Sequence, residues 1–336
     1  MRETRPRVKA QTTWAAIAFC ALATIANAKE ETTTSEYSPP RTSDGKPDLQ
    51  GVWTNNSATP LERPKMLAGR ARLTAEEVAA LRKRYAELFA GDGDAAFGDG
   101  VFEAVLSDVK KYKPTVFDAS TGNYNAFWLV EREFDDRTSL IVDPPDGRIP
   151  PLVPNVTRRN STMRFSNDGP EGRNLAERCI TYGVPDLLAG YNSYYEIIQT
   201  PGQVVVHAEK IHDARVIPLD GRPHLPAALH SWLGNSRGRW DGDTLVVETR
   251  NFTQGFRNAS EQLLITERYT RVSEMTLEYE VTIDDPKTWT RPWTFMIPLR
   301  RTDEMIYEYA CHEGNSSLAG ILAGARAEEA AAEGKK

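Results

Sequence analysis

Short runs of β-branched and aromatic residues, interleaved with polar ones, dominate the chain after residue 125. These runs are FWLVERE, TSLIVDPP, YYEIIQT, QVVVHAEKI, ARVIPL, SRGRW, TLVVETRNF, LLITERYTRV, TLEYEVTI, WTFMIPLRR and MIYEYACHE. Their length and composition predict β-strands. The breaks between them, such as TPGQ, LDGR and WDGD, are typical of hairpin turns.

The predicted strands follow one another too closely for crossover helices, so we expect an antiparallel meander. A sheet of about ten strands has two edges to protect, and closure into a barrel removes both of them. The pattern therefore predicts a mainly β domain over residues 121–326, built as a closed antiparallel meander. Residues 327–336 are expected to be a polar tail.

A helical pattern precedes the strands. Thr74 followed by Glu77 has the spacing of a capping box, which marks the start of a helix. Gly91 is a typical helix end. The stripe between them has helical spacing: Val78, Leu81, Tyr85 and Leu88. We predict a helix over residues 75–90, within an N-terminal segment (residues 47–120) that is either a separate domain or a lid.

The N-terminus predicts an exported protein. Four basic residues in the first nine precede an apolar run from Trp14 to Ile25, and Ala-Asn-Ala ends at Ala28. This is the pattern of a secretory signal peptide over residues 1–28, cleaved near Ala28. The apolar run is shorter than the roughly 20 residues of a membrane span. We expect a periplasmic or secreted protein whose first mature residues, 29–46, are disordered because they are polar and rich in Thr, Ser and Pro.

Charge excludes one class of partner. Removing the leader's four basic residues and one acid from totals of 41 and 47 leaves 37 and 46, a formal charge of −9. A nucleic-acid-binding protein needs a basic face, so we expect no nucleic-acid partner. The chain is long enough to bury a large core. The sequence does not indicate an oligomeric state.

The predicted export determines which cysteines remain in the mature chain and whether they pair. Cleavage removes Cys20 and leaves Cys179 and Cys311 in the mature chain. Two cysteines in an oxidising compartment usually pair. We therefore predict a Cys179–Cys311 disulfide, which closes a loop of about 130 residues and contributes roughly 3 to 5 kcal/mol.

The histidines do not form a metal motif. All five follow residue 200: His207, His212, His224, His230 and His312. Neither His-x-His nor His-Glu-x-x-His is present, so we predict no metal and no cofactor, while convergence of three of these side chains in space stays open. No Gly-x-Ser-x-Gly elbow, phosphate loop or dinucleotide fingerprint occurs either.

The predicted SRGRW hairpin places arginines on one strand face. If Asp241 and Gly242 occupy the centre of the turn, Arg239 lies opposite Thr244. One face then carries Arg237, Arg239, Thr244 and Glu248. Two interpretations are open: a solvent-facing ladder of charge pairs, or a barrel lumen in which guanidinium groups bind an anionic or phenolic ligand.

Histidine and carboxylate alternate in two other predicted strands. YEYACHE places His312 and Glu308 on one face, away from Cys311 and Tyr309, and HAEKIHDAR places His207 near Glu209. A carboxylate beside an imidazole fixes its tautomer and raises its basicity, which suits general acid–base chemistry. The alternative is a structural His–Glu pair.

Four sequence blocks resemble known proteins. GVWTN resembles the Gly-x-Trp signature of lipocalin-like barrels. RGRWDGDTLVVETRNF, TWTRPWT and YEYACHEGN resemble blocks of a broad family of exported, largely uncharacterised bacterial proteins. The resemblance covers about residues 178–326 and implies a lipocalin-like β-barrel, with no established activity.

We predict two functions from these patterns. The first is a cofactor-independent lyase or hydrolase acting on a small aromatic or sugar-derived acid; the alternative is a non-catalytic lipocalin-like binding protein. The candidate catalytic residues are His207, His230, His312 and Tyr309. The candidate substrate-binding residues are Arg215, Arg237, Arg239, Trp232 and Glu248. We expect one shared pocket to be lined by His207, His230, Arg237, Arg239 and His312.

Overall fold

The computed structural model describes residues 37–88, 102, 105, 106, 131–154, 156 and 167–334. The chain divides into two units, Met1–Glu36 and Tyr37–Lys336, and all described residues belong to the second. The predicted signal peptide and residues 29–36 of the segment predicted to be disordered (residues 29–46) therefore lie outside the described residues. The rest of that segment includes a turn, closed by a bridge between Arg41 and Pro47.

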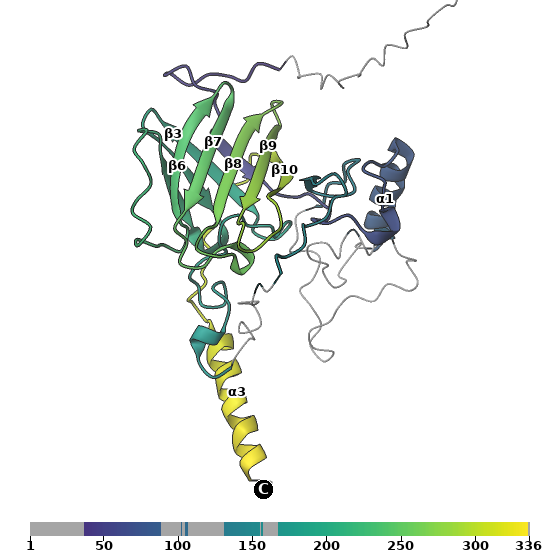
Figure 1. Ribbon diagram of the computed structural model, residues 1–336. Coiled ribbons are helices and arrows are strands. Elements are labelled where there is room, and N and C mark those ends of the chain that lie inside the picture. The colour runs from purple at the N-terminus through teal and green to yellow at the C-terminus, as the bar shows by residue number, and fades with distance from the viewer. Residues whose placement is uncertain are drawn as a thin grey trace, which may run out of the picture. The chain divides into compact units, whose positions relative to one another are not determined.

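One ten-stranded antiparallel sheet forms the centre of the described chain (Figure 1). Its strands are β1 (Gly51–Thr54), β2 (Ile141–Asp143), β3 (Tyr194–Thr200), β4 (Gln203–Ala208), β5 (Ala214–Pro218), β6 (Asn235–Asp241), β7 (Thr244–Arg250), β8 (Leu264–Arg271), β9 (Thr276–Asp284) and β10 (Trp293–Thr302). The order is β5-β4-β3-β1-β10-β9-β8-β7-β6, with β2 also paired to β10. The fold is therefore mainly β and antiparallel, as the alternating pattern predicts.

Strand β1 joins two meanders. Strands β3 to β5 form one and β6 to β10 the other, and β1 pairs with β3 on one side and β10 on the other. The short GVWT run thus connects segments that lie about a hundred residues apart in sequence. Trp53 is fully buried, and the guanidinium carbons of Arg271 and Arg301 lie 5.6 and 5.9 Å from its ring centre.

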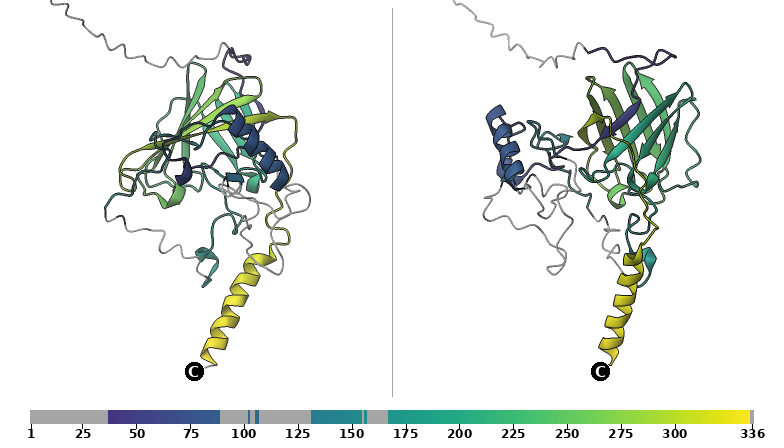
Figure 2. Two further views of the ribbon diagram at one scale, coloured as in Figure 1. Left: turned by 90° about the vertical axis from the view of Figure 1, so that its right-hand side faces the viewer. Right: turned by 180° about the vertical axis from the view of Figure 1, so that it is seen from behind.

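The sheet curls but does not close into the predicted barrel. Its path ends at β5 and β6, and no ladder joins these two strands. They approach through side chains instead: a Cβ on Gly238 would lie 2.8 Å from Ile217 and 2.7 Å from Leu219. Backbone pairing is hindered here because aliphatic side chains fill the space and Pro218 has no N–H to donate. Figure 2 shows the curled sheet from two further sides.

Strict alternation places the core on one face of the sheet. On β8, β9 and β10, buried and partly exposed residues alternate at nearly every position. Because side chains on a strand point to opposite faces in turn, each of these strands contributes one buried row. The core side chains of these rows include Ile265, Leu277, Val281, Ile283, Phe295, Ile297 and Leu299.

The predicted N-terminal helix is present as α1 (Ala75–Leu88), and its capping box is confirmed. The Glu77 backbone N–H donates to Thr74 Oγ1 (3.2 Å), and the Thr74 N–H donates to Glu77 Oε2 (2.8 Å). Val78 and Leu81 are buried in a cluster separate from the sheet core, with Leu67, Leu73 and Phe134 among its other members. Short 3₁₀ turns occur at Lys65–Leu67, Pro170–Gly172, Lys210–His212 and Phe256–Asn258.

One sequence expectation at the C-terminal end is wrong. MIYEYACHE is not a strand, because β10 ends at Thr302 and residues 303–310 have no regular structure. A helix that the sequence pattern did not predict, α3 (Ser316–Glu333), spans the predicted boundary at residue 326 between the β-domain and the polar tail. This segment is rich in alanine and glutamate, which favour helix, and none of its residues is buried.

Most of the predicted FWLVERE strand lies outside the described residues. Its described part, residues 131–133, contributes an isolated bridge between Glu133 and Ser57 rather than a strand. Within the described part of the chain, no helix is long and apolar enough to cross a membrane.

Candidate functional site

The predicted disulfide is present. Cys179 and Cys311 are bonded, with their Cα atoms 5.7 Å apart across a sequence separation of 132 residues. The bond fixes the chain after β10 against the segment that precedes β3. In this arrangement the Tyr309 hydroxyl lies 3.3 Å from the hydroxyl of Tyr182, and the Tyr309 N–H donates to Nε2 of His212 (3.0 Å).

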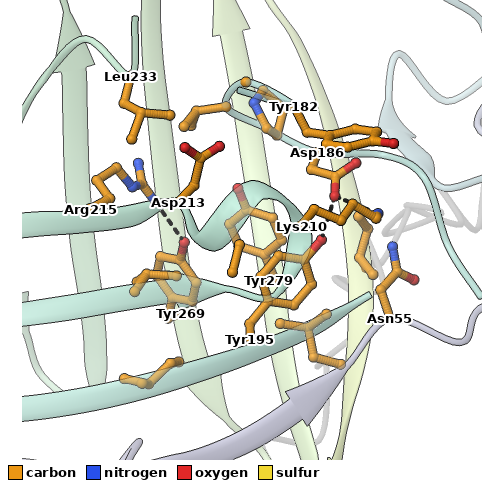
Figure 3. A pocket seen from close by; sticks show the side chains of 18 residues that line it. Asn55, Tyr182, Asp186, Tyr195, Lys210, Asp213, Arg215, Leu233, Tyr269 and Tyr279 are labelled. Carbon is orange, nitrogen blue, oxygen red and sulfur yellow. Dashed lines mark hydrogen bonds and ion pairs between the residues drawn. The ribbon is translucent and has the colours of Figure 1, made fainter. Parts of the chain in front are cut away.

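A pocket of about 60 Å³ lies on the inner face of the sheet, and we call it the tyrosine pocket (Figure 3). Strands β3, β4, β5, β8, β9 and β10 form its walls, and the segment from Tyr182 to Asp186 contributes a further side. Its polar lining residues are Asn55, Tyr182, Asp186, Tyr195, Lys210, Asp213, Arg215, Tyr269 and Tyr279. Its apolar lining residues include Ile197, Val206, Leu233, Ile297 and Leu299.

A buried ion pair forms one wall of the tyrosine pocket. Arg215 on β5 binds Glu267 on β8 with two hydrogen bonds and also donates to the Tyr269 hydroxyl (3.1 Å). Tyr269 and Tyr279 each donate to Glu267 Oε1, at 2.9 and 2.7 Å. Burial opposes the charge on Glu267, but Arg215 and the two hydroxyls outweigh it and hold the pKa of this carboxyl below its usual range. Glu267 is therefore ionised, and both of its carboxylate oxygens accept hydrogen bonds.

A second ion pair involves Lys210 and Asp186. Lys210 Nζ donates to Asp186 Oδ2 (2.7 Å), to the Leu188 carbonyl (2.7 Å) and to Ser193 Oγ (3.3 Å). Tyr195 donates to the same Asp186 oxygen (3.0 Å). Burial lowers the pKa of Lys210, while Asp186 opposes that change. An ammonium group has three N–H donors, and all three have acceptors here.

Asp213 and Asp186 are the two carboxylates among the described lining residues, and Asp213 differs both from Asp186 and from Glu267, the partner of Arg215. The Thr181 hydroxyl donates to its Oδ2 (2.5 Å), and the Tyr182 backbone N–H also contributes a hydrogen bond. Burial raises the pKa of Asp213; these two donors oppose the rise and the negative charge of Asp186 adds to it. In the described chain, Asp213 forms no ion pair with a basic side chain.

Of the predicted site residues, Arg215 lines the tyrosine pocket, and Tyr309 does not line it but contacts the lining residue Tyr182 through its hydroxyl. His207 is half-buried on β4; its Nδ1 lies 3.6 Å from Glu196, and its ring stacks 6.3 Å from the ring of His212. The predicted partner Glu209 instead accepts a hydrogen bond from Asn192 (2.6 Å). The catalytic roles of His207 and Tyr309 stay predictions.

The other predicted site residues do not line this pocket. Arg239 and His312 are exposed, and Arg237 donates to the Pro223 carbonyl (3.1 Å). Glu248 is half-buried opposite Arg237 on the neighbouring strand, and Trp232 is 39% exposed. His230 lines a separate surface pocket with Phe252 to Gly255 and Ala259 to Glu261. The structure therefore does not bring His207, His230, Arg237, Arg239 and His312 together in the tyrosine pocket.

The β6–β7 hairpin has a different register from the predicted one. Asp241 pairs with Thr244, so Gly242 and Asp243 form the turn, and Gly242 has the positive φ of +58° that the turn requires. Arg239 consequently lies opposite Val246 rather than Thr244. The change moves the register by two residues, so the predicted faces are preserved. Ser236 and Gly238 are buried on the inner face and Arg239 is on the outer face.

Sequence reasoning missed most of the tyrosine pocket. The lining residue Tyr269 and Glu267, the partner of Arg215, had a usable signal, because they share the face of β8 that also carries Ile265. A carboxylate in an otherwise apolar row is expected to have a buried partner. Asp186, Lys210 and Asp213 come from irregular segments, and no periodicity marks them.

Among the described residues, no group of three or more His, Cys, Asp or Glu side chains is placed to hold a metal ion. Comparison with family models, with curated proteins and with solved structures found no match to this chain. Function must therefore be inferred from the geometry of the tyrosine pocket.

Proposed function

We propose that the protein is a non-catalytic binding protein that holds a small organic molecule in the tyrosine pocket. The pocket combines an apolar surface with a few fixed polar groups, which is the usual composition of a small-molecule site. In this proposal the curled sheet serves the same purpose as a lipocalin-like barrel, with the ligand held on its inner face. The proposed location is the periplasm or the exterior of the cell.

One observation carries the choice of binding over catalysis. Two of the three carboxylates at the pocket, Glu267 and Asp186, are neutralised by Arg215 and Lys210. Both cations and the phenol groups of Tyr195, Tyr269 and Tyr279 already have hydrogen-bond partners. A general base or nucleophile needs a free lone pair directed at the substrate, and the paired groups do not offer one. Asp213 has no such ion pair, but no His, Ser, Thr or Cys side chain of the described residues lines the pocket with it to complete a catalytic group.

The enzyme predicted from the histidines remains a second hypothesis. Its candidate residues His230 and His312 lie outside the tyrosine pocket lining, and so does His207. No specific observation favours it over binding. Chemical conversion of a bound compound by the protein would support the enzyme hypothesis instead.

A steric block of the pocket tests the proposed function. Val206 lines the pocket on β4, whereas Val216 on the adjacent strand is 50% exposed. Val206→Phe is expected to reduce binding of 4-methylbenzyl alcohol or 4-methylbenzylamine at least tenfold, while Val216→Phe leaves binding unchanged. Ligand-observed NMR with the mature chain provides the measurement. Failure of both compounds to bind, or equal binding by the two variants, would reject the proposal.

A further inference from the structure

The charges around the tyrosine pocket do not balance. Lys210 and Asp186 form one pair at 2.7 Å, and Arg215 and Glu267 form another. Asp213 remains, and no basic side chain of the described residues forms an ion pair with it. The lining and its direct partners therefore carry one net negative charge at neutral pH when Asp213 is ionised.

Asp213 is placed to meet a ligand. Its side chain belongs to the pocket lining and is partly exposed, unlike the buried Glu267. In Figure 3 it lies on the same side of the pocket as Leu233 and Tyr182, with Tyr195 and Tyr279 on the other side. Burial raises the pKa of this carboxyl, as expected for a charge without a counter-ion, and a bound cation would reverse that effect.

The aromatic lining also favours a cation. Four tyrosines line the pocket, and the rings of Tyr269 and Tyr279 stack at 4.7 Å. The faces of aromatic rings attract cations within about 6 Å. The protein already uses this attraction here, since Lys210 Nζ lies 5.2 Å from the centre of the Tyr182 ring.

We propose that the tyrosine pocket binds an organic cation, a protonated amine carried on a small ring or short apolar body. The ammonium group donates to Asp213, and the apolar body packs against the aliphatic lining of β3, β4 and β10. This inference rests on the proposed function and adds the chemical class of the ligand.

The same geometry disfavours the acidic ligand expected from the arginines. Arg215 uses both of its terminal nitrogens on Glu267, so it cannot bind a ligand carboxylate without breaking that pair. An anion would also enter a weakly solvated space next to the unpaired Asp213. Removing an anion from water without a counter-ion is unfavourable.

Three compounds of the same shape test the inference: 4-methylbenzylamine, 4-methylbenzyl alcohol and 4-methylbenzoate. At pH 7 the amine is protonated and the acid is ionised. We expect the amine to bind the mature protein at least tenfold more tightly than the alcohol, and the benzoate to bind more weakly than the alcohol, by ligand-observed NMR. A charge-assisted hydrogen bond supports a difference of this size.

The variant Asp213→Asn removes the charge while it keeps an oxygen that accepts from Thr181. It should reduce amine binding about tenfold and change alcohol binding less than twofold. The matched control is Asp220→Asn, since Asp220 is exposed, pairs with Arg222 and does not line the pocket. It should leave the preference for the amine intact.

A second measurement does not depend on a variant: amine binding to the native protein should weaken as the pH falls and Asp213 is protonated. Equal binding of amine and alcohol, or an amine preference that survives Asp213→Asn, would overturn the inference. If Val206→Phe still blocks the alcohol in that case, the proposed binding function stands. If none of the three compounds binds, both fail.

Discussion

At the scale of single residues, the core of this sheet accommodates charge by pairing it. Arg215 and Glu267 are 8% and 0% exposed as residues, and each satisfies the other with two hydrogen bonds. A paired buried charge is tolerated, whereas a buried charge without its partner is strongly destabilising. The pair therefore affects stability chiefly because removing one partner would leave the other as a buried charge without a counter-ion.

Replacing one partner should expose this dependence. Glu267→Gln leaves the Arg215 charge without a counter-ion, so we expect the free energy of unfolding to fall by about 3 to 5 kcal/mol. Urea denaturation of the purified variant measures the change. Glu280→Gln on the outer face of β9 is the control and should change stability by less than about 1 kcal/mol. A loss for Glu267→Gln as small as the control's would contradict the prediction.

Asp213 should behave in the opposite way. Because burial raises the pKa of its carboxyl, the folded protein binds this proton more tightly than the unfolded chain does. The ionised carboxylate therefore destabilises the fold at neutral pH, and this effect disappears as the pH falls through the folded-state pKa.

We expect Asp213→Asn to raise the melting temperature at pH 7 by about 1 to 2 °C, a small change because the group is partly solvated. The difference should shrink between pH 7 and pH 4 in calorimetric scans. A variant that melts below the native protein at pH 7 would show that Asp213 stabilises the fold rather than serving a ligand.

At the scale of elements, α1 depends on its first turn. The helix has two buried side chains, Val78 and Leu81, so packing contributes less to it than to the strands of the sheet. The reciprocal bonds between Thr74 and Glu77 satisfy N–H groups that the helix itself cannot pair.

Thr74→Ala is expected to destabilise the helix by about 1 kcal/mol. Amide hydrogen exchange should show faster exchange within residues 75–88 and unchanged exchange in β7 to β9, since α1 packs in a separate cluster. Thr253→Ala provides the control, because Thr253 is exposed and lies outside any helix. Uniform loss of protection across the sheet would indicate that α1 and the sheet unfold together instead.

At the scale of the whole molecule, the disulfide joins parts of the chain that the sheet leaves far apart in sequence. It bonds Cys311, beyond β10, to Cys179, ahead of β3. Next to this bond, Tyr309 contacts Tyr182 and His212. Cross-linking a loop of this length stabilises a protein mainly by restricting the unfolded chain.

The double variant Cys179→Ala with Cys311→Ala should lose about 4 kcal/mol of unfolding free energy, in line with a loop of more than a hundred residues. Urea denaturation measures this loss, and a dithiol reductant should bring the native protein toward the same stability. The reductant should not affect the double variant, which is the internal control. A loss below about 1 kcal/mol would mean that the unfolded chain is already restricted in this region.

Local pattern predicted the strands and α1 because their determinants lie within a few residues. Strands β3 to β10 begin at or within one residue of the predicted runs, and the capping box marked the start of α1. The disulfide followed from cysteine content once cleavage near Ala28 was assumed. Helix α3 and the irregular chain after Thr302 were not predicted, since tyrosine-rich alternation resembles a strand whether or not a neighbouring strand is available to pair with it.

The sequence alone therefore determined the antiparallel strands, the turn chemistry, the cysteine pair and the first helix, all of which depend on short-range periodicity and residue type. The tertiary structure decided three further features: that β1 joins the two meanders, that β5 and β6 meet without pairing, and that Asp213 lies among four tyrosines with no basic partner among the described residues. These depend on how a curled sheet brings distant strands together. Whether a charge is paired is a property of that three-dimensional neighbourhood, and no spacing along the chain encodes it.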